Sequence, residues 1–387
     1  MEPPRIFILG AGFSVPAGLP TSRELLGLVR SGLRPVGHGG HLEGSLEDYA
    51  AFKKATTGRA PAAVDIEDFA AFQDYEYAYG LAGSDRWSQD GNRCQLQLRW
   101  GIGRVLHRLT PCAAKLPSVY LRFAERLRPR DVVVTFNYDR VLETALDRSG
   151  PPYRRFPERL LEISGGTARI DVRTESQEVL LVKVHGSIDW ISWEQFQDDG
   201  VLSWAGDTAG QSSELELADT LYRERPPRRV RPLIEGPVAP TDPLRWVLVV
   251  QDIDGYYRQP DSLYSYPPLI LAPSTAKQLY SRPFEGMWRG IDGVPSYWAG
   301  VSLIGYSLPS ADPYALQALY GLTSGYGRAL DRSDPEEGPK RRIEVVNLAT
   351  SPQDQAALLR RYRFIPRRHA TFMTSGFSEA SVDALFQ

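Results

Sequence analysis

Short apolar runs, each followed at once by glycine or polar residues, form the strongest pattern along the chain. Five of them are Ile6–Leu9, Val132–Val134, Leu180–Val184, Val301–Ile304 and Ile343–Val346. Apolar residues at consecutive positions, rather than at every second one, indicate strands covered on both faces, as in parallel sheets flanked by helices. Ligands of such sheets bind beyond the carboxyl ends of the strands, so we expect a site where these runs end. Two further strand candidates are Val247–Val250 and Leu269–Leu271.

Between the first two runs the spacing of apolar residues is helical. The pattern predicts helices over Leu46–Lys54, Ile66–Tyr79, Gln95–Leu109 and Val119–Leu127. The sequence therefore predicts an α/β protein with a Rossmann-type parallel sheet, helices on both faces and a large helical insertion. The expected organisation is a sheet domain over residues 1–30 and 129–350, a helical insertion over 31–128 and a C-terminal extension over 351–387.

Composition places the chain among globular proteins, with 42% hydrophobic and 24% charged residues. Its 45 Lys and Arg residues nearly balance its 47 Asp and Glu residues, so the net charge of -2 implies no strong field for nucleic acid or an anionic membrane. Two cysteines, Cys94 and Cys112, are too few for a disulfide framework or a four-thiolate zinc site. No apolar stretch approaches the length of a membrane span. We therefore expect a cytoplasmic protein without a metal centre.

A glycine-rich turn, Gly10-Ala11-Gly12-Phe13-Ser14, follows the first apolar run. Backbone amides of such a turn can hold a diphosphate, the glycines admit a close approach of the ligand, and the Ser14 hydroxyl can bind a phosphate oxygen. The dinucleotide fingerprint G-x-G-x-x-G has a third glycine, but this chain has Val15 at that position. The sequence therefore does not favour an ordinary redox dehydrogenase. The alternative interpretation is a plain tight turn between a strand and a helix.

Polar side chains also follow the second and third runs. Thr135, Asn137 and Asp139 follow one run, and His185 with Gly186 follows the other. An imidazole at a strand end can accept a proton near neutral pH, and the glycine after it leaves room for a ligand. Taken singly, Asn and Asp are just as typical of helix caps, and a lone histidine is more often structural. Their shared place at one end of the predicted sheet favours a functional site.

In order along the chain, these motifs resemble the sirtuin signature. The set comprises Gly10-Ala11-Gly12-x-Ser14, Thr135-x-Asn137-x-Asp139, His185-Gly186, Gly305-x-Ser307 and Asn347, and the loop Gly18–Arg23 is similar as well. The variant forms, with Gly305-Tyr306-Ser307-Leu308-Pro309 followed by Asp312, are most similar to the sirtuin-like NAD hydrolases of bacterial anti-phage defence. The resemblance covers about residues 1–30 and 131–350 and leaves the helical region aside.

The resemblance implies that NAD binds across the strand ends. The expected NAD contacts are Gly10, Ala11, Gly12 and Ser14 at the diphosphate, Gly305, Tyr306 and Ser307 on the adenosine side, Asn347 at the adenine ribose, and in addition Arg23, Thr135 and Asp312. Asn137, Asp139 and His185 would surround the nicotinamide ribose. We expect His185 to polarise or deprotonate a ribose hydroxyl, Asn137 to hold the sugar and the attacking water, and Asp139 to support the carboxamide or the loop. Cleavage of the bond to nicotinamide builds oxocarbenium character, which such groups can orient and stabilise.

Two departures from the sirtuin deacylases favour hydrolysis of NAD over acyl transfer. The chain lacks the four cysteines of their zinc module. It also has Thr21-Ser22-Arg23 where those enzymes have Asp-Phe-Arg, so the aromatic residue that shields the nicotinamide pocket is missing. Water would then reach the reactive carbon more easily.

The expected function is therefore that of an NAD glycohydrolase that releases nicotinamide and ADP-ribose. The resemblance implies a regulated defence effector, controlled by oligomerisation or by a separately encoded partner such as a sensor or a DNA-translocating ATPase. No membrane attachment and no direct contact with nucleic acid are expected. Two alternatives remain open: an NAD-dependent protein deacylase or ADP-ribosyltransferase, and a non-catalytic module that senses NAD or ADP-ribose.

Overall fold

The computed structural model describes most of the chain. The described residues are 3–34, 37, 39–81, 91–156, 160–164, 167–170, 177–192, 202–203, 216–217, 230–236, 238, 242–259, 266–276, 284–288, 297–308, 312–332 and 340–387. The chain forms two compact units. Unit 1 comprises Met1–Thr21, Thr110–Val184 and Glu285–Gln387, and unit 2 comprises Ser22–Leu109 and His185–Phe284.

A seven-stranded parallel sheet forms the centre of unit 1. Its order is β14 (Ala370–Met373), β13 (Ile343–Val346), β12 (Gly300–Ile304), β1 (Arg5–Leu9), β2 (Val132–Thr135), β6 (Val179–Lys183) and β3 (Tyr153–Arg154). All neighbouring strands are parallel. The five apolar runs of the sequence thus form its five inner strands, because their side chains are covered on both faces. The predicted fold class is confirmed.

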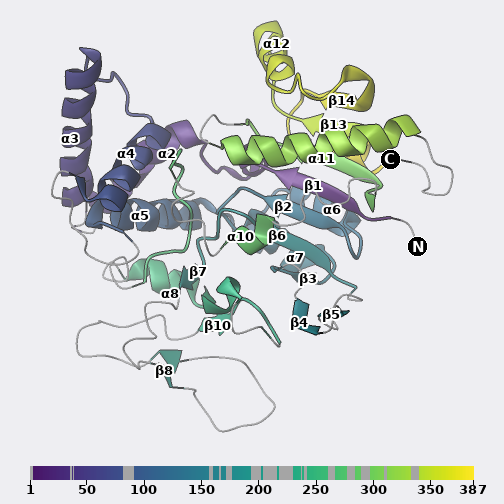
Figure 1. The fold of residues 1–387 in the computed structure, drawn as a ribbon, viewed down its shortest axis with the longest axis horizontal. Coiled ribbons are helices and arrows are strands. Elements are labelled where there is room, and N and C mark those ends of the chain that lie inside the picture. Colours follow the sequence, from purple (N-terminus) through teal and green to yellow (C-terminus); the bar gives the residue numbers. More distant parts are fainter. Residues whose placement is uncertain are drawn as a thin grey trace. The chain divides into compact units, whose positions relative to one another are not determined.

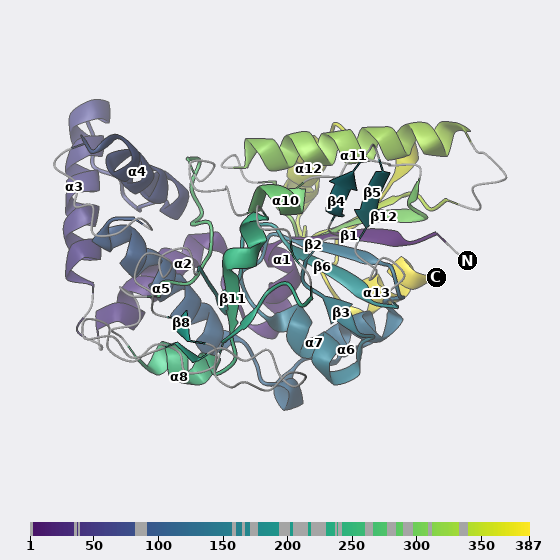
Figure 2. The ribbon, with the colours of Figure 1, turned by 60° about the horizontal axis from the view of Figure 1, so that its bottom comes forward.

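Helices cover both faces of this sheet. Figure 2 shows α11 (Pro313–Arg332) and α12 (Pro352–Arg361) over one face, and α6 (Ser118–Arg126), α7 (Val141–Ser149) and α13 (Glu379–Phe386) over the other. Aromatic side chains fill the second interface: Phe7 of β1 lies with its ring centroid 5.4 Å from Phe123 and 5.6 Å from Phe386. The unit also contains the short helices α1 (Ala11–Ser14) and α10 (Glu285–Trp288) and the hairpin β4 (Leu160–Ser164) and β5 (Thr167–Ile170).

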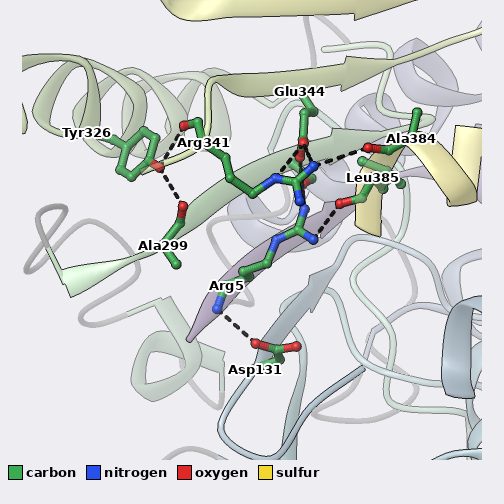
Figure 3. A network of polar contacts seen from close by, with 9 residues as sticks. Arg5, Asp131, Ala299, Tyr326, Arg341, Glu344, Ala384 and Leu385 are labelled. Carbon is green, nitrogen blue, oxygen red and sulfur yellow. Dashed lines mark hydrogen bonds and ion pairs between the residues drawn. The ribbon is translucent and has the colours of Figure 1, made fainter. Parts of the chain in front are cut away.

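A buried polar network joins β1 to the C-terminal helix. The guanidinium of Arg5 donates to Glu344 Oε2 at 2.9 Å, to Ser302 Oγ at 3.1 Å and to the carbonyl of Leu385 at 2.6 Å (Figure 3). Glu344 also accepts two hydrogen bonds from Arg341. The inner runs of the sheet are therefore not wholly apolar, since Ser302 and Glu344 lie within them and satisfy one another.

Among the described residues, unit 2 contains four long helices, one short helix and a small antiparallel sheet. The helices are α2 (Ser22–Leu33), α3 (Gly40–Thr57), α4 (Ile66–Tyr79) and α5 (Arg93–Leu109), and the three strands are β10 (Val230–Pro232), β11 (Val247–Val250) and β7 (Trp190–Ser192). Figure 1 labels β7, β10 and α8 of this unit, and Figure 2 labels β11. Gly101 of α5 lets this helix approach α2, because a Cβ atom there would lie 2.6 Å from a methyl group of Val29. The unit also holds α8 (Ile253–Arg258), β8 (Leu202–Ser203) and β9 (Glu216–Leu217).

The units do not follow the boundaries expected from the sequence. Helix α6, expected within the insertion, lies in unit 1, and so do residues 351–387, expected as an extension. The reason is packing: α6 covers the parallel sheet, and β14 extends it by pairing with β13. Of the two additional strand candidates, Val247–Val250 is β11, while Leu269–Leu271 forms only an isolated bridge from Ile270 to Gly186. None of the helices in the described part of the chain is long and apolar enough to cross a membrane.

Candidate functional site

The carboxyl ends of four strands bring most of the candidate residues of unit 1 to one edge of the sheet. In the register of the sheet, the last residue of β1 is level with those of its neighbours: Leu9 pairs with Thr135 and with Ile304, and Ile304 pairs with Val346. The residues that leave the strands at this edge are Gly10, Phe136, Gly305 and Asn347. We refer to this edge, formed by Gly10–Ser14, Thr135–Asp139, Gly305–Ser307 and Asn347, as the rim.

Asn137 is anchored to the glycine-rich turn by its side-chain amide. Its Nδ2 donates to the carbonyl of Gly10 at 2.9 Å and to Ser14 Oγ at 3.0 Å, and Ser14 Oγ in turn donates to Asp139 Oδ2 at 2.8 Å. All three side chains are at least nine-tenths buried. The other amide atom, Asn137 Oδ1, accepts no hydrogen bond from the residues that the structure describes. Asn137 Oδ1 can therefore still accept a hydrogen bond from a ligand.

The Ser14 hydroxyl is engaged within the protein. It contacts Asn137 and Asp139 and so joins the turn after β1 to the loop after β2, while its expected contact with a phosphate oxygen stays a prediction. The backbone N–H of Asn137 donates to Thr135 Oγ1 at 3.1 Å, so Thr135 supports the same loop from inside the protein.

Asp139 is a buried carboxylate, 7% exposed. Its Oδ1 accepts from the backbone N–H of Val141, the second contact beside Ser14. Burial raises the pKa of Asp139 above its ordinary value, and nearby Lys183 opposes that rise. These contacts are those of a group that supports the loop, and a contact with a carboxamide stays a prediction.

A buried ion pair beneath this loop was missed by the sequence analysis. Lys183 at the end of β6 donates to the backbone carbonyl of Asp139 and, at 2.8 Å, to Glu143 Oε1 of α7. Both side chains are 1% exposed. The signal in the sequence was a lysine inside an otherwise apolar run, because a buried lysine needs a partner. Nothing near Lys183 in the sequence identified Glu143 as that partner.

The glycines of the turn are required by the protein's own backbone. A Cβ atom on Gly10 would lie 2.5 Å from Tyr306 Cα, and one on Gly12 would lie 2.8 Å from Gly305 Cα. The N–H groups of Gly10 and Gly12 donate to the carbonyls of Ile304 and Gly305, at 3.0 and 2.8 Å. These two amides are therefore engaged within the protein. That the turn meets a diphosphate stays a prediction. Ala11, between the two glycines, is exposed at the start of α1.

The loop after β12 is held from several sides. The ring of Tyr306 stacks on that of Phe136, with centroids 4.2 Å apart and an angle of 16° between the planes. Its hydroxyl donates to Asp312 Oδ2 at 3.1 Å, and its carbonyl accepts from Asn347 Nδ2 at 3.0 Å. Tyr306 and Asp312 are buried by these contacts, so the surface that this loop offers to a ligand is Ser307, which is exposed, and the half-buried Asn347.

Two of the candidate residues, His185 and Arg23, belong to unit 2. His185 is 3% exposed, and its carbonyl accepts from the N–H of Leu271 at 2.9 Å. The glycine after it does not leave room for a ligand as expected: a Cβ atom on Gly186 would lie 2.1 Å from the carbonyl oxygen of Leu269. Arg23 is exposed in the first turn of α2. That His185 and Asn137 face the same sugar stays a prediction.

No group of three or more His, Cys, Asp or Glu side chains that could hold a metal ion occurs among the residues with described positions. Cys94 is buried in unit 2, and Cys112 is exposed in unit 1. Neither forms a disulfide.

Comparison with known proteins connects part of the chain to one family. A family model for a SIR2-like domain matches residues 131–220. This stretch contains Thr135, Asn137, Asp139 and His185. A chain from a solved structure described as "The Structural basis of Sirtuin Substrate Affinity" is 12% identical, over 99% of this chain and 92% of that chain, with a TM-score of 0.36. Among curated proteins, no match was found.

Proposed function

We propose that the chain hydrolyses NAD to nicotinamide and ADP-ribose. The observation that carries the proposal is the setting of Asn137, which lies at the carboxyl end of a central parallel strand, inside the stretch that matches a SIR2-like domain. Its Nδ2 is anchored to Gly10 and Ser14, so its Oδ1 is the atom left to bind substrate.

The chemistry requires a sugar held still and a water directed at C1. The bond from ribose C1 to nicotinamide breaks, its electron pair neutralises the pyridinium ring, and water adds to C1 with release of a proton. Asn137 Oδ1 is a neutral acceptor that can orient a ribose hydroxyl or this water, and its partial negative charge stabilises the positive sugar. We propose that His185 takes up the proton.

The rest of the rim would bind the rest of NAD. Because two glycine amides and the Ser14 hydroxyl are engaged within the protein, we propose that Ala11 borders the diphosphate, and that Ser307 and Asn347 meet the adenosine half. Arg23 is proposed as a cation for the diphosphate. In this arrangement Asp139, Thr135, Tyr306 and Asp312 act by positioning the loops.

An enzyme that destroys NAD must be restrained in the cell. We therefore propose a cytoplasmic anti-phage effector that is held inactive until oligomerisation or a separate partner activates it. Sedimentation of the purified protein, alone and with products of neighbouring genes, measures this directly. A monomer with full activity on its own would contradict it.

The decisive measurement is chromatography of NAD and its products after incubation with purified protein. Wild type should release nicotinamide and ADP-ribose without any acceptor peptide. Asn137→Ala should lower the rate by about 10²–10³-fold, as loss of one preorganised polar group does in other active sites, while circular dichroism stays unchanged. Dependence on an acylated peptide would instead identify a deacylase, and binding of NAD without turnover would identify a sensing module.

A further inference from the structure

A surface groove in unit 1 has the features of an interaction site and lies apart from the Asn137 side chain. It has a volume of about 550 Å³, and it lies between the start of α11 and the segment that ends α12. Leu316 and Tyr320 of α11 line it and are 43% and 55% exposed. Four residues apart, they lie on the same side of the helix, and Phe364 lines the groove with them. Large apolar side chains left in contact with solvent as a group mark binding surfaces.

Three arginines give this groove its charge. Arg360, Arg361 and Arg363 all line it, and none of its lining residues is acidic. Their side chains form no hydrogen bond or ion pair with any residue whose position the structure describes. Arg341 of the same unit, by contrast, is paired with Glu344 at 2.7 Å. The groove thus combines unpaired positive charge with exposed apolar surface.

We propose that this groove binds an acidic segment of a partner protein that also carries apolar side chains. Carboxylates of the partner segment would pair with the arginines. Its apolar side chains would cover Leu316 and Tyr320, spaced one turn apart if the segment is helical or two residues apart if it is extended. A small anionic ligand fits less well. Sites for small molecules enclose the ligand and hold a few polar side chains in fixed positions, whereas all three arginines here are exposed. Nucleic acid fits less well too, since the net charge of -2 provides no extended positive field.

Both walls of the groove are connected to the rim by hydrogen bonds to Tyr306. Asp312, directly before Pro313 of the α11 wall, accepts from the Tyr306 hydroxyl at 3.1 Å. Tyr362, between the lining residues Arg361 and Arg363, donates its hydroxyl proton to the Tyr306 carbonyl at 2.5 Å. A partner that moves either wall therefore moves the loop after β12. That such a partner regulates NAD hydrolysis rests on the proposed function.

Binding is tested without NAD. The probe is a fluorescein-labelled peptide rich in Glu and Leu, followed by fluorescence anisotropy with full-length protein. The double variant Arg361→Glu/Arg363→Glu should weaken binding by about tenfold or more. The matched control is Arg328→Glu/Arg332→Glu, which reverses two exposed arginines of α11 that do not line the groove. We expect the control to change binding by less than about twofold.

Several outcomes would overturn the proposal. Equal losses in both double variants would show attraction by net charge alone. Equal binding of a peptide in which Lys replaces Glu would remove the charge argument. Tighter binding of oligothymidine that is lost in the Arg361→Glu/Arg363→Glu variant would assign the groove to nucleic acid, and self-association lost in that variant would assign it to a second copy of this chain.

The connection to the rim has its own readout. Peptide binding should change amide hydrogen exchange at Gly305–Ser307, and Tyr362→Phe should weaken that change because it deletes the hydrogen bond to Tyr306. If the proposed function holds, peptide should also change the rate of nicotinamide release by about threefold or more. Unchanged exchange at this loop, with the peptide bound, would refute the connection. A protein that binds the peptide but never releases nicotinamide would refute the proposed function and leave the docking surface standing.

Discussion

Ser14 is a hydroxyl shared between an amide and a carboxylate, which makes it a sensitive probe of the rim. It accepts from Asn137 and donates to Asp139, and it is 2% exposed. Its single proton and its acceptor capacity are both in use. The position of the Asn137 amide therefore depends on a residue that need not touch the substrate.

We expect Ser14→Ala to destabilise the protein and to slow the proposed hydrolysis of NAD. Asp139 Oδ2 would lose its donor inside the protein, which costs about 1–3 kcal/mol. The Asn137 amide would keep only its hydrogen bond to the Gly10 carbonyl. We therefore expect the variant to hydrolyse NAD about tenfold more slowly than wild type. Urea unfolding and chromatographic product analysis measure the two effects. Ser307→Ala, at an exposed position of the same rim, is the stability control and should stay within about 0.5 kcal/mol of wild type.

The pKa of Asp139 gives a prediction with a definite sign. Burial raises this pKa above 3.8, so between the unfolded and folded values the folded protein binds more protons than the unfolded chain. The contribution of Asp139 to stability is then greatest at low pH and falls as pH rises through the folded-state pKa. Asp139→Asn cannot titrate. We expect the free energy of unfolding of wild type, relative to this variant, to fall as pH rises, by about 1.4 kcal/mol per pH unit between the two pKa values. A difference independent of pH would contradict the raised pKa.

At the scale of the elements, the Arg5 network fixes how the C-terminal helix closes the sheet. Arg5 touches β12 through Ser302, β13 through Glu344 and α13 through Leu385. Its guanidinium carbon also lies 4.6 Å from the ring centroid of Phe7, on the same strand. One side chain thus joins three elements that are far apart in the sequence, at 1% exposure.

We expect Arg5→Met to lower the free energy of unfolding by about 3–5 kcal/mol, because it leaves the buried carboxylate of Glu344 with one cationic partner fewer. Arg341→Met removes a partner whose side chain is 30% exposed, and we expect a cost of about 1 kcal/mol. The double variant Arg5→Met/Glu344→Met should lose less than the sum of its two single variants, since no carboxylate remains to be compensated. Denaturant titrations of wild type, the three single variants Arg5→Met, Glu344→Met and Arg341→Met, and the double variant test this. Equal costs for Arg5→Met and Arg341→Met would show that burial does not set the strength of the pair.

At the scale of the whole molecule, the candidate catalytic residues are divided between the two units. Asn137 belongs to unit 1 and His185 to unit 2, although only Val184 separates His185 from the end of strand β6 in the chain. The division into units thus falls within the stretch that carries the candidate motifs.

His185→Ala should lower nicotinamide release by about 10²–10⁴-fold, the range that a general base contributes. The matched control is His107→Ala, a histidine of the same unit that pairs with Asp254 at 2.8 Å and should keep wild-type turnover. Thermal unfolding with and without NAD separates binding from chemistry, because a ligand at about 100 times its Kd stabilises by about 2.7 kcal/mol. Undiminished turnover in His185→Ala would refute its role.

Much of the fold and the placement of the rim could be predicted from the sequence. Consecutive apolar residues need cover on both faces, so the runs around Phe7, Val133 and Leu303 determined a parallel sheet between helices. The end of each run determined where Gly10, Asn137 and Gly305 would gather. The spacing of apolar residues likewise predicted helices at α3, α4 and α5 of unit 2 and at α6 of unit 1, because amphipathic periodicity is local.

Only the tertiary structure decided what these residues contact. Ser14 and Asp139 are 125 positions apart, and Arg5 and Leu385 are 380 positions apart. Their hydrogen bonds depend on sheet order and helix packing, which no local pattern contains. For the same reason the glycines suggested a cradle for a ligand, while their missing Cβ atoms in fact admit the backbone of Gly305 and Tyr306. The sequence determined which residues reach the rim, and packing determined which of their atoms remain free for chemistry.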